Sequence, residues 1–461
     1  MSAACSTAGP RALVIPRRPR RREQRQRLPH DSRSAEGSPA RSALDSRARP
    51  GAACSARSLG ADDQPVAIRF GERALAHAER AQEKLESGRD RGPLHGIPVT
   101  IKDIIDVADV PMEAGSRILA GNVPEHNAPV VDRLEEAGAI VLAKARTHEF
   151  AWGATTHPMR NPWNPSRIPG GSSGGSAAWV AAGFGTVSIG SDSAGSVRSP
   201  ASFNGVVGHK PTYGLIGRGG LVPLAWSLDT IGVFTHTVED AALVPDAVAG
   251  PDPRELTSVQ QPHSPVAHEV DASVEGLRVR VPERPFFNAT QADVETLQRA
   301  VISMLADAGA EIISIELEPL WAFEAVLTAA FVIAAAKPAA WLETKRDLYA
   351  ADVLRYLDAG RALSAATYLD AQRVRQGVID AFASAFCSVD LLAMPTHTHI
   401  APQADDEMVT YDRGKPLHRD PAGIRCLCAV NLAGVSARGL GPGRSRTRPA
   451  GRAAPDRATP R

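Results

Sequence analysis

Residues 169–200 read PGGSSGGSAAWVAAGFGTVSIGSDSAGSVRSP, and this stretch decides how the chain is interpreted. It contains two glycine-rich loops, with Ser172 in the first and Ser196 in the second, 24 residues later. Upstream, residues 96–103 read GIPVTIKD and include Lys102. A nucleophilic hydroxyl, a second hydroxyl that relays a proton and a lysine base are sufficient for acyl transfer. We therefore expect no metal and no cofactor.

Lys102 can act as a base only when it is neutral. It follows an apolar strand, residues 97–101, so we expect it to be buried. Burial lowers the pKa of a lysine because a low-dielectric interior disfavours the ammonium form. The alternative is a lysine at a strand end that pairs with Asp103 or Asp106, and the residues alone leave both interpretations open.

The glycines of the second loop allow backbone N–H groups to converge on one point, which is how an oxyanion hole is built. We expect these donors on Ser193, Ala194 and Gly195. Neither loop is followed by the Gly-Lys-Ser/Thr of a phosphate-binding P-loop, and the second loop lacks the G-x-S-x-G of a nucleophile elbow. Acyl transfer is therefore favoured over phosphate binding.

The two ends of the chain differ from its middle in charge. Residues 1–60 contain thirteen arginines and four acidic residues, and residues 438–461 contain seven arginines and one acidic residue, although the net charge of the whole chain is only +1. Segments of this composition bury too little apolar surface to fold. We therefore expect disordered tails at 1–66 and 438–461 that flank one domain at 67–437. Such tails could bind nucleic acid, but unstructured tails without a partner explain the same composition, so we expect no nucleic-acid partner.

Helical and strand patterns alternate between the tails. Residues 130–137 place apolar side chains on one helical face, and residues 140–142 follow as a strand. Residues 277–281 alternate like a strand, and residues 294–305 carry an apolar helical stripe. The stripe consists of Val294, Leu297, Val301 and Leu305. Alternation of this kind predicts an α/β domain with a largely parallel or mixed sheet covered by helices.

The cysteines and the hydropathy of the chain indicate in which cellular compartment the protein is expected. The chain has five cysteines at loose spacings, which favours reduced thiols and a cytoplasmic protein. The most apolar stretch, residues 325–336, is too short to cross a bilayer, so we expect no membrane span.

Taken together, the motifs resemble the amidase signature family. Besides residues 96–103 and the two loops, FNGVVGHKPTYG at residues 203–214 and LDTIG at residues 228–232 occur in the family's order. Weaker similarity extends over residues 68–437. The resemblance implies a single α/β/α domain with a mixed sheet, and an amidase that hydrolyses a carboxylic amide.

The resemblance also implies roles for individual residues. Ser196 is the nucleophile, Ser172 is the bridging serine that follows a cis peptide bond, and Lys102 is the terminal base. Ser172 is chosen over Ser173 because the family's bridging serine is the first of the pair and precedes the nucleophile by 24 residues. Ser173 is then expected to support the loop.

Three further positions are interpreted through the resemblance. Asp192 and Arg198 resemble the family's residues that orient the second loop; taken alone, they would be interpreted as a surface salt bridge. Ala194 stands where the family usually has glycine. If this position needs a positive φ, alanine costs about 1 kcal/mol or more and distorts the oxyanion donors.

Both ends depart from the family pattern. After residues 431–437 the family continues with apolar strands and a helix, whereas here a basic tail begins. We therefore expect a sheet that is incomplete at its C-terminal end, and one interpretation of both tails is coding sequence translated out of frame. The resemblance further implies that residues 321–349 help to line the substrate pocket.

These observations lead to one functional interpretation and two alternatives. We interpret the chain as an amidohydrolase that cleaves a small-molecule amide through an acyl-enzyme on Ser196. The first alternative is the A-type subunit of a glutamine-dependent aminoacyl-tRNA amidotransferase, which needs partner subunits. The second is a truncated or inactive relative. Formation of a homodimer is left open.

Overall fold

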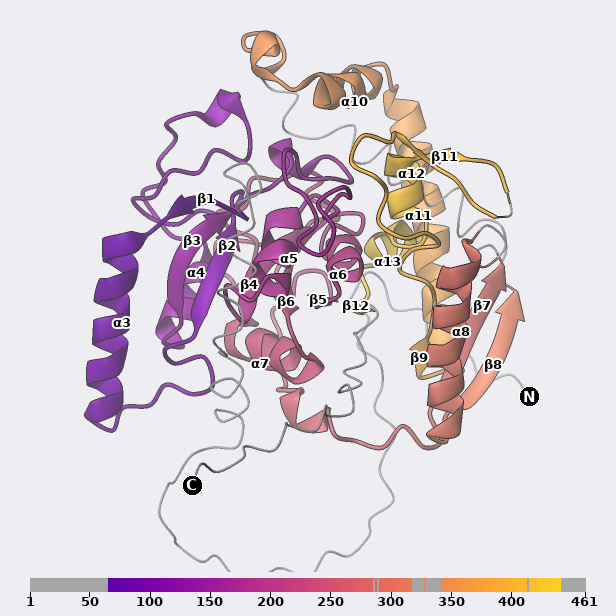
Figure 1. The fold of residues 1–461 in the computed structure, drawn as a ribbon, viewed down its shortest axis with the longest axis horizontal. Coiled ribbons are helices and arrows are strands. Elements are labelled where there is room, and N and C mark those ends of the chain that lie inside the picture. Colours follow the sequence, from indigo (N-terminus) through magenta and orange to yellow (C-terminus); the bar gives the residue numbers. More distant parts are fainter. Residues whose placement is uncertain are drawn as a thin grey trace, which may run out of the picture.

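A computed structural model describes residues 65–284, 287, 290–316, 327, 341–412 and 414–440. The expected N-terminal tail, apart from its last two residues, lies outside the described residues, as do residues 441–461. Figure 1 shows a central sheet with helices on both faces.

The central sheet has seven strands in the order β1-β3-β2-β4-β6-β5-β12. Their bounds are β1 (Val66–Arg69), β2 (Pro98–Lys102), β3 (Ile140–Ala145), β4 (Val187–Asp192), β5 (Val207–Lys210), β6 (Thr230–Thr235) and β12 (Ala437–Leu440). β2 runs parallel to β3 and β4, whereas the β1–β3, β4–β6, β5–β6 and β5–β12 pairs are antiparallel. The prediction of a mixed sheet is therefore confirmed.

The register of β2 and β4 positions the residues of the site. Ile101 lies opposite Ile189, so Lys102 and Ser191 extend beyond this pair in the same direction. Because carboxyl ends of parallel strands meet at one edge of a sheet, the ends of β2 and β4 bring their polar residues together there.

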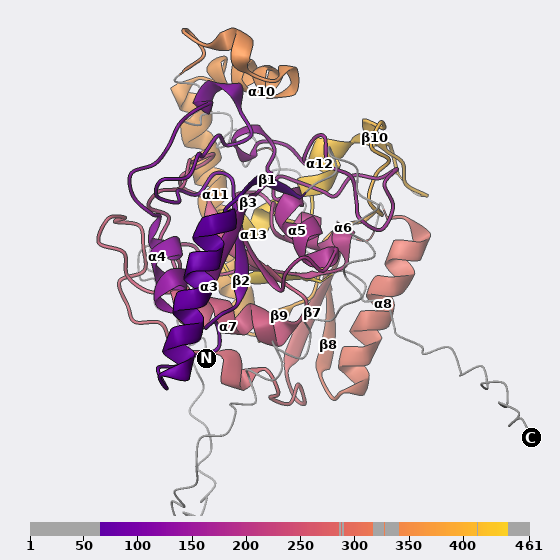
Figure 2. The same cartoon turned by 60° about the vertical axis from the view of Figure 1, so that its left-hand side comes forward.

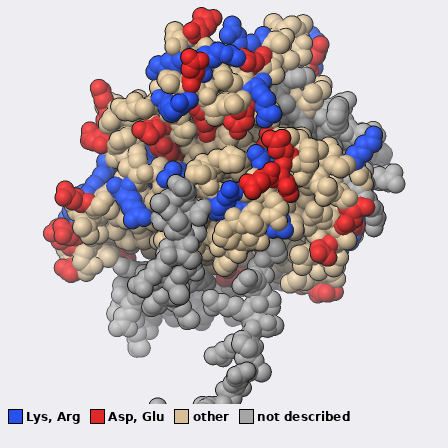
Figure 3. All heavy atoms as spheres, turned by 45° about the horizontal axis from the view of Figure 1, so that its top comes forward, with Lys and Arg blue, Asp and Glu red and all other residues tan. Residues whose placement is uncertain are grey.

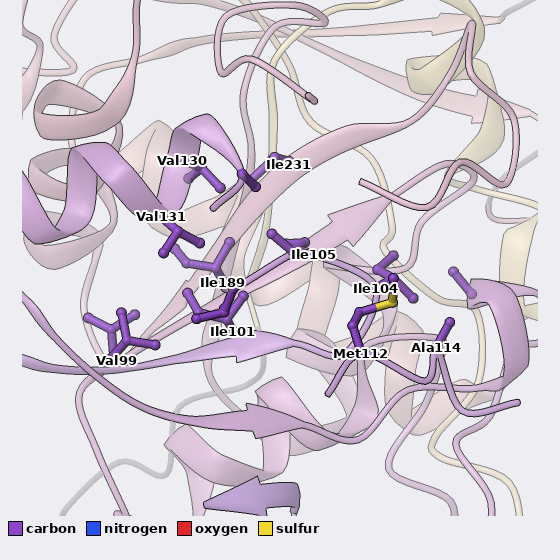
Figure 4. Close-up of a cluster of buried hydrophobic side chains, with 14 of the residues drawn as sticks. Val99, Ile101, Ile104, Ile105, Met112, Ala114, Val130, Val131, Ile189 and Ile231 are labelled. Carbon is purple, nitrogen blue, oxygen red and sulfur yellow. The ribbon is translucent and has the colours of Figure 1, made fainter. Parts of the chain in front are cut away.

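Helices cover both faces of this sheet, as an α/β/α arrangement requires. They are α3 (Gly71–Glu86), α4 (Pro129–Glu136), α5 (Gly174–Ala181), α6 (Arg198–Asn204) and α7 (Val238–Val248). Alternate residues of one strand point to opposite faces. On β6, Ile231 belongs to the apolar cluster with α4 and α7, whereas Phe234 packs with α5 and α6. Figure 4 shows the first cluster, in which Val130 and Val131 of α4 face Ile101 and Ile189 of the sheet.

A second, three-stranded parallel sheet has the order β8-β7-β9. It consists of β7 (Arg278–Arg284), β8 (Glu311–Glu316) and β9 (Leu391–Leu392), with α8 (Ala292–Asp307) alongside. α3 and α8 lie on opposite sides of the central sheet's helices in Figure 1, and α8 stays at the right-hand edge in Figure 2. The strand and helix patterns at residues 277–281 and 294–305 are thus real, but they belong to this small sheet.

The apolar stripe predicted on α8 is wrong at its centre. Leu297 and Val301 are 53% and 54% exposed, whereas Val294 and Leu305 are half-buried. A sheet whose third strand, β9, has only two residues offers little surface for the helix to cover.

The remaining elements surround the ends of β2 and β4 or flank the two sheets. The helices are α10 (Ala351–Arg361), α11 (Ala365–Phe386), α12 (Arg419–Ile424) and α13 (Cys428–Ala433), with a hairpin of β10 (Met408–Val409) and β11 (Leu417–His418). Short 3₁₀ turns lie at Arg117–Leu119, Glu149–Ala151, Ala267–Glu269 and Arg346–Leu348. α13 packs against α11 and, through Leu432, joins an apolar cluster that includes Ala194 of the second loop.

Strand β12 runs three residues past the expected domain boundary at Ala437. It pairs with β5, with Ala437 opposite Lys210 and Leu440 opposite Val207. Gly439 packs so closely against Arg198 that a Cβ atom would lie 2.8 Å from the Arg198 carbonyl oxygen. This late segment is therefore in direct contact with the helix that follows the second loop.

Candidate active site

Lys102 and Ser172 meet inside the protein. Lys102 ends β2, and Ser172 lies in the first glycine-rich loop, before α5. Both side chains are fully buried, and the Lys102 Nζ is 2.7 Å from the Ser172 Oγ. The peptide bond between Gly171 and Ser172 is cis, as the resemblance implies.

A third hydroxyl contacts the same amine. The Ser191 Oγ, at the end of β4, is 2.9 Å from the Lys102 Nζ. Sequence reasoning quoted Ser191 but gave it no role, because its proximity to Lys102 depends on the parallel pairing of β2 with β4. Knowing that β2 pairs with β4 would have identified Ser191 as a neighbour of Lys102.

Burial determines the charge of Lys102. Desolvation lowers the pKa of its amine from 10.5 to about 7, although the carboxylates of Asp192 and Asp229 act in the opposite direction. The groups that touch the Nζ are hydroxyls, which stabilise an ammonium less than an adjacent carboxylate does. A substantial fraction of Lys102 is therefore neutral near pH 7.

The interpretation of Lys102 as the partner of Asp103 is wrong. The Asp103 Oδ1 lies 3.4 Å from the Nζ of Lys144, a second fully buried lysine. Lys144 also donates to the carbonyl oxygen of Ile105. Lys144 therefore has the structural role that the sequence left open for Lys102.

The Ser173 side chain contacts the end of β4. Its Oγ donates to the backbone carbonyl of Ser191 at 3.1 Å and does not bond to Lys102. This contact ties the first loop to the end of β4, which carries Ser191 beside the lysine.

Ser196 lies where the second loop enters α6. It is partly exposed and lines a cavity, and its hydroxyl has no hydrogen-bond partner among the residues that the structure describes. The preceding Gly195 has a φ of 121°, and a Cβ there would lie 2.4 Å from the Leu427 side chain. Glycine is therefore required immediately before the serine.

The expected strain at Ala194 is absent, since this residue does not adopt a positive φ. The positive φ is at Gly195, one position later. The reasoning from sequence assigned the conformational demand to the wrong residue, and alanine at 194 is compatible with the loop.

The three expected oxyanion donors are not equivalent. The N–H of Gly195 donates to the Asp192 Oδ1 at 2.8 Å. The N–H groups of Ser193 and Ala194 have no acceptor within the described part of the chain. The Ser193 hydroxyl donates to the Asp229 Oδ1 at 2.5 Å, which fixes this end of the loop.

Asp192 and Arg198 form a buried pair rather than a surface salt bridge. Arg198 donates to both carboxylate oxygens, at 2.9 and 3.0 Å, and the two side chains are 0% and 2% exposed. Asn431 of α13 donates to the Asp192 Oδ1 at 2.8 Å and accepts from Arg198. Sequence reasoning missed Asn431, whose contact spans 239 residues.

The cavity beside Ser196 has a volume of about 330 Å³. Its apolar walls include Trp152, Leu224, Leu363 and Ile424. Asp420 is the one charged residue among the described residues that line it, and Tyr356 donates a hydrogen bond to that carboxylate.

The segment expected to line the pocket, residues 321–349, contributes nothing where it is described. Residues 327 and 341–349 do not line the cavity, and the others lie outside the described residues. Within the described ranges, no cluster of three or more His, Cys, Asp or Glu side chains could hold a metal ion. No helix there has the length and apolar content to cross a membrane.

Comparison with known proteins gives consistent matches. The sequence model of the amidase family matches residues 54–445. The A-type subunit of glutamyl-tRNA(Gln) amidotransferase from Chloroflexus aurantiacus is 36% identical over 400 residues, which cover 79% of this chain and 80% of the relative.

Solved structures show the same fold. A structure from work on the evolutionary origins of an s-triazine catabolic enzyme, described as part of a vestigial protein complex, superposes with a TM-score of 0.78 at 29% identity, covering 87% of each chain. A crystal structure of an amidase superposes with a TM-score of 0.73 at 31% identity, covering 84% of this chain and 86% of the other.

Proposed function

The chain belongs to the amidase family, and from this premise we propose that it hydrolyses a carboxylic amide through an acyl-enzyme on Ser196, with Ser172 as relay and Lys102 as base. One observation carries the proposal. The Nζ of Lys102 lies 2.7 Å from the Ser172 Oγ, and burial lowers the pKa of this amine to about 7.

In the first half of the reaction, the Ser196 Oγ attacks the amide carbon. Its proton passes to the Ser172 Oγ while Ser172 passes its own proton to the neutral Lys102 Nζ. The new negative charge on the carbonyl oxygen accepts hydrogen bonds from the free N–H groups of Ser193 and Ala194. We leave Gly195 out of this set, because its N–H is held by Asp192.

In the second half, the amine leaves and water replaces it. The Lys102 ammonium returns a proton through Ser172 to the amide nitrogen, so that the C–N bond breaks and a neutral amine departs. Water then attacks the ester on Ser196 and loses its proton by the same route. The carboxylic acid is released, and Ser196 recovers its hydroxyl.

The cavity favours a neutral, largely apolar acyl group. Among its described lining residues there is no lysine or arginine, and Asp420 is the single charge. A free amino acid such as glutamine carries a carboxylate, which needs a cationic or hydrogen-bonded partner when it is desolvated. This observation supports the amidohydrolase over a glutamine-dependent enzyme.

The amidotransferase role remains a second candidate because of the relative in Chloroflexus aurantiacus, which is 36% identical over 400 residues. In that case the chain would act on glutamine in a complex. The two candidates therefore differ in substrate and in the need for partners.

A reducing compartment, the cytoplasm, is part of the proposal. The three cysteines in the described part of the chain, Cys387, Cys426 and Cys428, form no disulfide bond with one another. Structural disulfides are typical of oxidising compartments.

The test measures ammonia release from benzamide, phenylacetamide, hexanamide and L-glutamine by the isolated chain. We expect turnover of the neutral amides, and we expect Ser196→Ala to lower it by about 10³-fold or more. Ser202→Ala, on the same helix but away from the cavity, is the matched control. Labelling of the wild-type chain, but not of Ser196→Ala, by a fluorophosphonate provides an independent readout.

Three results would contradict the proposal. Full activity in Ser196→Ala would remove the nucleophile. Release of ammonia from glutamine alone, and only in the presence of partner subunits, would favour the amidotransferase. A chain that neither turns over any of the four amides nor reacts with the fluorophosphonate would be an inactive relative.

A further inference from the structure

A second serine faces the cavity one helical turn after the nucleophile. Ser199, on α6, is 3% exposed and lines the same cavity as Ser196. The N–H of Ser199 donates to the carbonyl of Gly195 at 2.7 Å, so residues 195–199 already form a helical turn. Side chains three residues apart on a helix lie on one side, with Cβ atoms about 5–6 Å apart. An acyl group held on Ser196 therefore passes close to the Ser199 hydroxyl.

A buried histidine holds this hydroxyl from behind. The His397 Nε2 is 2.9 Å from the Ser199 Oγ. The imidazole is stacked on Phe203, with ring centroids 4.1 Å apart and planes 10° apart, and His399 lies 5.1 Å away. The backbone carbonyl of His397 accepts a hydrogen bond of 2.6 Å from the Gln298 side chain. These contacts fix the position and orientation of the ring.

The position of the single imidazole proton decides which way the Ser199 hydroxyl points. Burial lowers the pKa of His397 well below its usual range, so the ring is neutral. Its Nδ1 is buried and has no partner among the described residues. A buried N–H without an acceptor is rarer in proteins than an acceptor without a donor, so we place the proton on Nε2. The Nε2–H then donates to Ser199.

This assignment leaves the Ser199 hydroxyl proton without a protein acceptor. His397 already occupies a lone pair of the Oγ, and no other bond of the Ser199 side chain exists within the described ranges. The remaining free direction is the cavity. Ser199 is therefore a neutral hydrogen-bond donor among cavity-lining residues that are mostly apolar.

We propose that Ser199 donates a hydrogen bond to an acceptor atom in the acyl part of the amide, and that His397 is the positioning residue for this hydroxyl. The inference rests on the proposed function, because it takes the acyl group to be attached to Ser196. The spacing of the two serines places the acceptor about two to four bonds from the scissile carbonyl. A carboxylate acceptor is disfavoured because Asp420 lines the same cavity. The substrate class is an apolar amide with an ether, carbonyl or ring-nitrogen acceptor at that distance.

Two isosteric substrates test the proposal. Phenoxyacetyl p-nitroanilide and 3-phenylpropanoyl p-nitroanilide differ by an ether oxygen in place of a methylene. We define the selectivity as kcat/KM for the ether substrate divided by kcat/KM for the methylene substrate. The two anilides differ in intrinsic reactivity, but this difference is the same for every variant and cancels when the selectivities of two variants are compared. Ser199→Ala should lower the selectivity by about three- to tenfold, the contribution of one neutral hydrogen bond. Ser202→Ala, the same substitution one turn further on, should leave the ratio at the wild-type value.

Variants of His397 separate positioning from structure. His397→Gln retains an N–H near the place of Nε2 and should keep most of the selectivity. His397→Leu removes it and should lower the selectivity in the same direction as Ser199→Ala, mainly through the KM of the ether substrate. If His397→Leu fails to give a cooperative thermal transition, Ser199→Ala decides the question alone.

The outcomes distinguish this inference from the function beneath it. An unchanged ratio in Ser199→Ala, together with loss of turnover in Ser196→Ala, overturns the role of Ser199 and leaves the amidase. An equal loss on both anilides also overturns it, because the contact would not involve the ether oxygen. Absence of any hydrolysis that depends on Ser196 overturns the proposed function, and the role of Ser199 with it.

Discussion

Three buried lysines in the described part of the chain differ in what their amines touch. Lys144 faces Asp103 and a backbone carbonyl, and Lys210 donates to the carbonyl of Pro211. Lys102 alone has two serine hydroxyls within 3 Å of its Nζ. A hydroxyl can both give and take a proton, whereas a carbonyl only accepts a hydrogen bond. The hydrogen-bond partner, rather than burial, distinguishes the proposed base from the other two lysines.

The proposed base predicts a pH profile for kcat/KM. Lys102 must be neutral to accept a proton, and burial lowers its pKa to about 7. We therefore expect kcat/KM for a neutral amide to rise about tenfold per pH unit below pH 7 and to level off above it. Rates measured between pH 5 and pH 9, with Ser196→Ala as the background, give the profile.

Ser191 provides the matched variant for this profile. Its hydroxyl accepts a hydrogen bond from the ammonium form of Lys102, which favours the charged state. Ser191→Ala should therefore move the inflection to lower pH. A profile that is flat from pH 5 to 9, or an inflection that moves to higher pH in Ser191→Ala, contradicts the assignment.

At the residue scale, the sequence predicted which residues matter better than it predicted their geometry. It singled out Lys102 and Ser172, which the structure brings together. It could not find Ser191, because that contact depends on which strands pair, or Asn431, which contacts the second loop from 239 residues away. The sequence also did not show which loop residue has the positive φ. The structure places it at Gly195 and not at the neighbouring Ala194, and the residue types alone did not distinguish these two positions.

At the scale of elements, the helical periodicity of apolar residues predicted the buried face of α4 correctly and that of α8 only in part. Val130, Val131 and Leu134 were predicted to face the core and are at most 1% exposed. Leu297, predicted by the same periodicity, is 53% exposed. Periodicity identifies the apolar face of a helix but not whether the partner surface is large enough to cover it.

The difference in burial between α4 and α8 predicts that a leucine-to-alanine substitution lowers the free energy of unfolding more in α4 than in α8. Leu134→Ala removes a fully buried side chain from the main apolar cluster and should lower the free energy of unfolding by about 2–5 kcal/mol. Leu297→Ala removes a side chain that is largely in water and should change it by about 0.5 kcal/mol or less. Urea denaturation of both variants measures the difference. Equal losses would mean that α8 is covered in solution.

At the scale of the molecule, the sequence predicted a mixed sheet under helices but not its strand order. β4 lies between β2 and β6, and β5 lies between β6 and β12. The β5–β12 pair joins segments more than 200 residues apart in the chain, such as Val207 and Leu440. Local patterns contain no information about such pairing, which also explains why the two sheets were not separated.

Buried ionisable groups predict how stability changes with pH. In the folded protein, burial lowers the pKa of Lys102 and of Lys210 to about 7, from 10.5. Between pH 7 and 10.5 the unfolded chain thus binds more protons, and the free energy of unfolding rises with pH by up to about 1.4 kcal/mol per pH unit for each lysine. Burial raises the pKa of Cys426 and Cys428 from 9.0 to about 12, so above pH 9 these thiols act in the opposite direction.

Urea unfolding at pH 6, 7, 8, 9 and 10 measures this profile. We expect stability to increase from pH 7 to about pH 9 and to gain little beyond it. Lys210→Met removes one of the two lysine contributions and should reduce the slope between pH 7 and 9. A free energy of unfolding that falls over this interval would show that the two amines keep their protons in the folded state.

Surface charge is mixed on the face in Figure 3, where basic and acidic side chains are interspersed. Nucleic-acid binding typically uses a continuous basic patch that follows the phosphate backbone. The described residues on this face form no such continuous patch.

The hydrogen bond from Arg198 to Asn431 has a consequence for the synthesis of the protein. Asn431 follows Arg198 by 233 residues, and a ribosome that adds about 5–20 residues per second needs roughly 12–47 s to reach it. During that interval the nascent chain already contains Lys102 and both serine loops but lacks the side chain that holds the Asp192–Arg198 pair from the far side. The Asp192–Arg198 pair is therefore completed only after most of the described chain has been made, and chains that stop before α13 carry Lys102 and both serine loops without this contact.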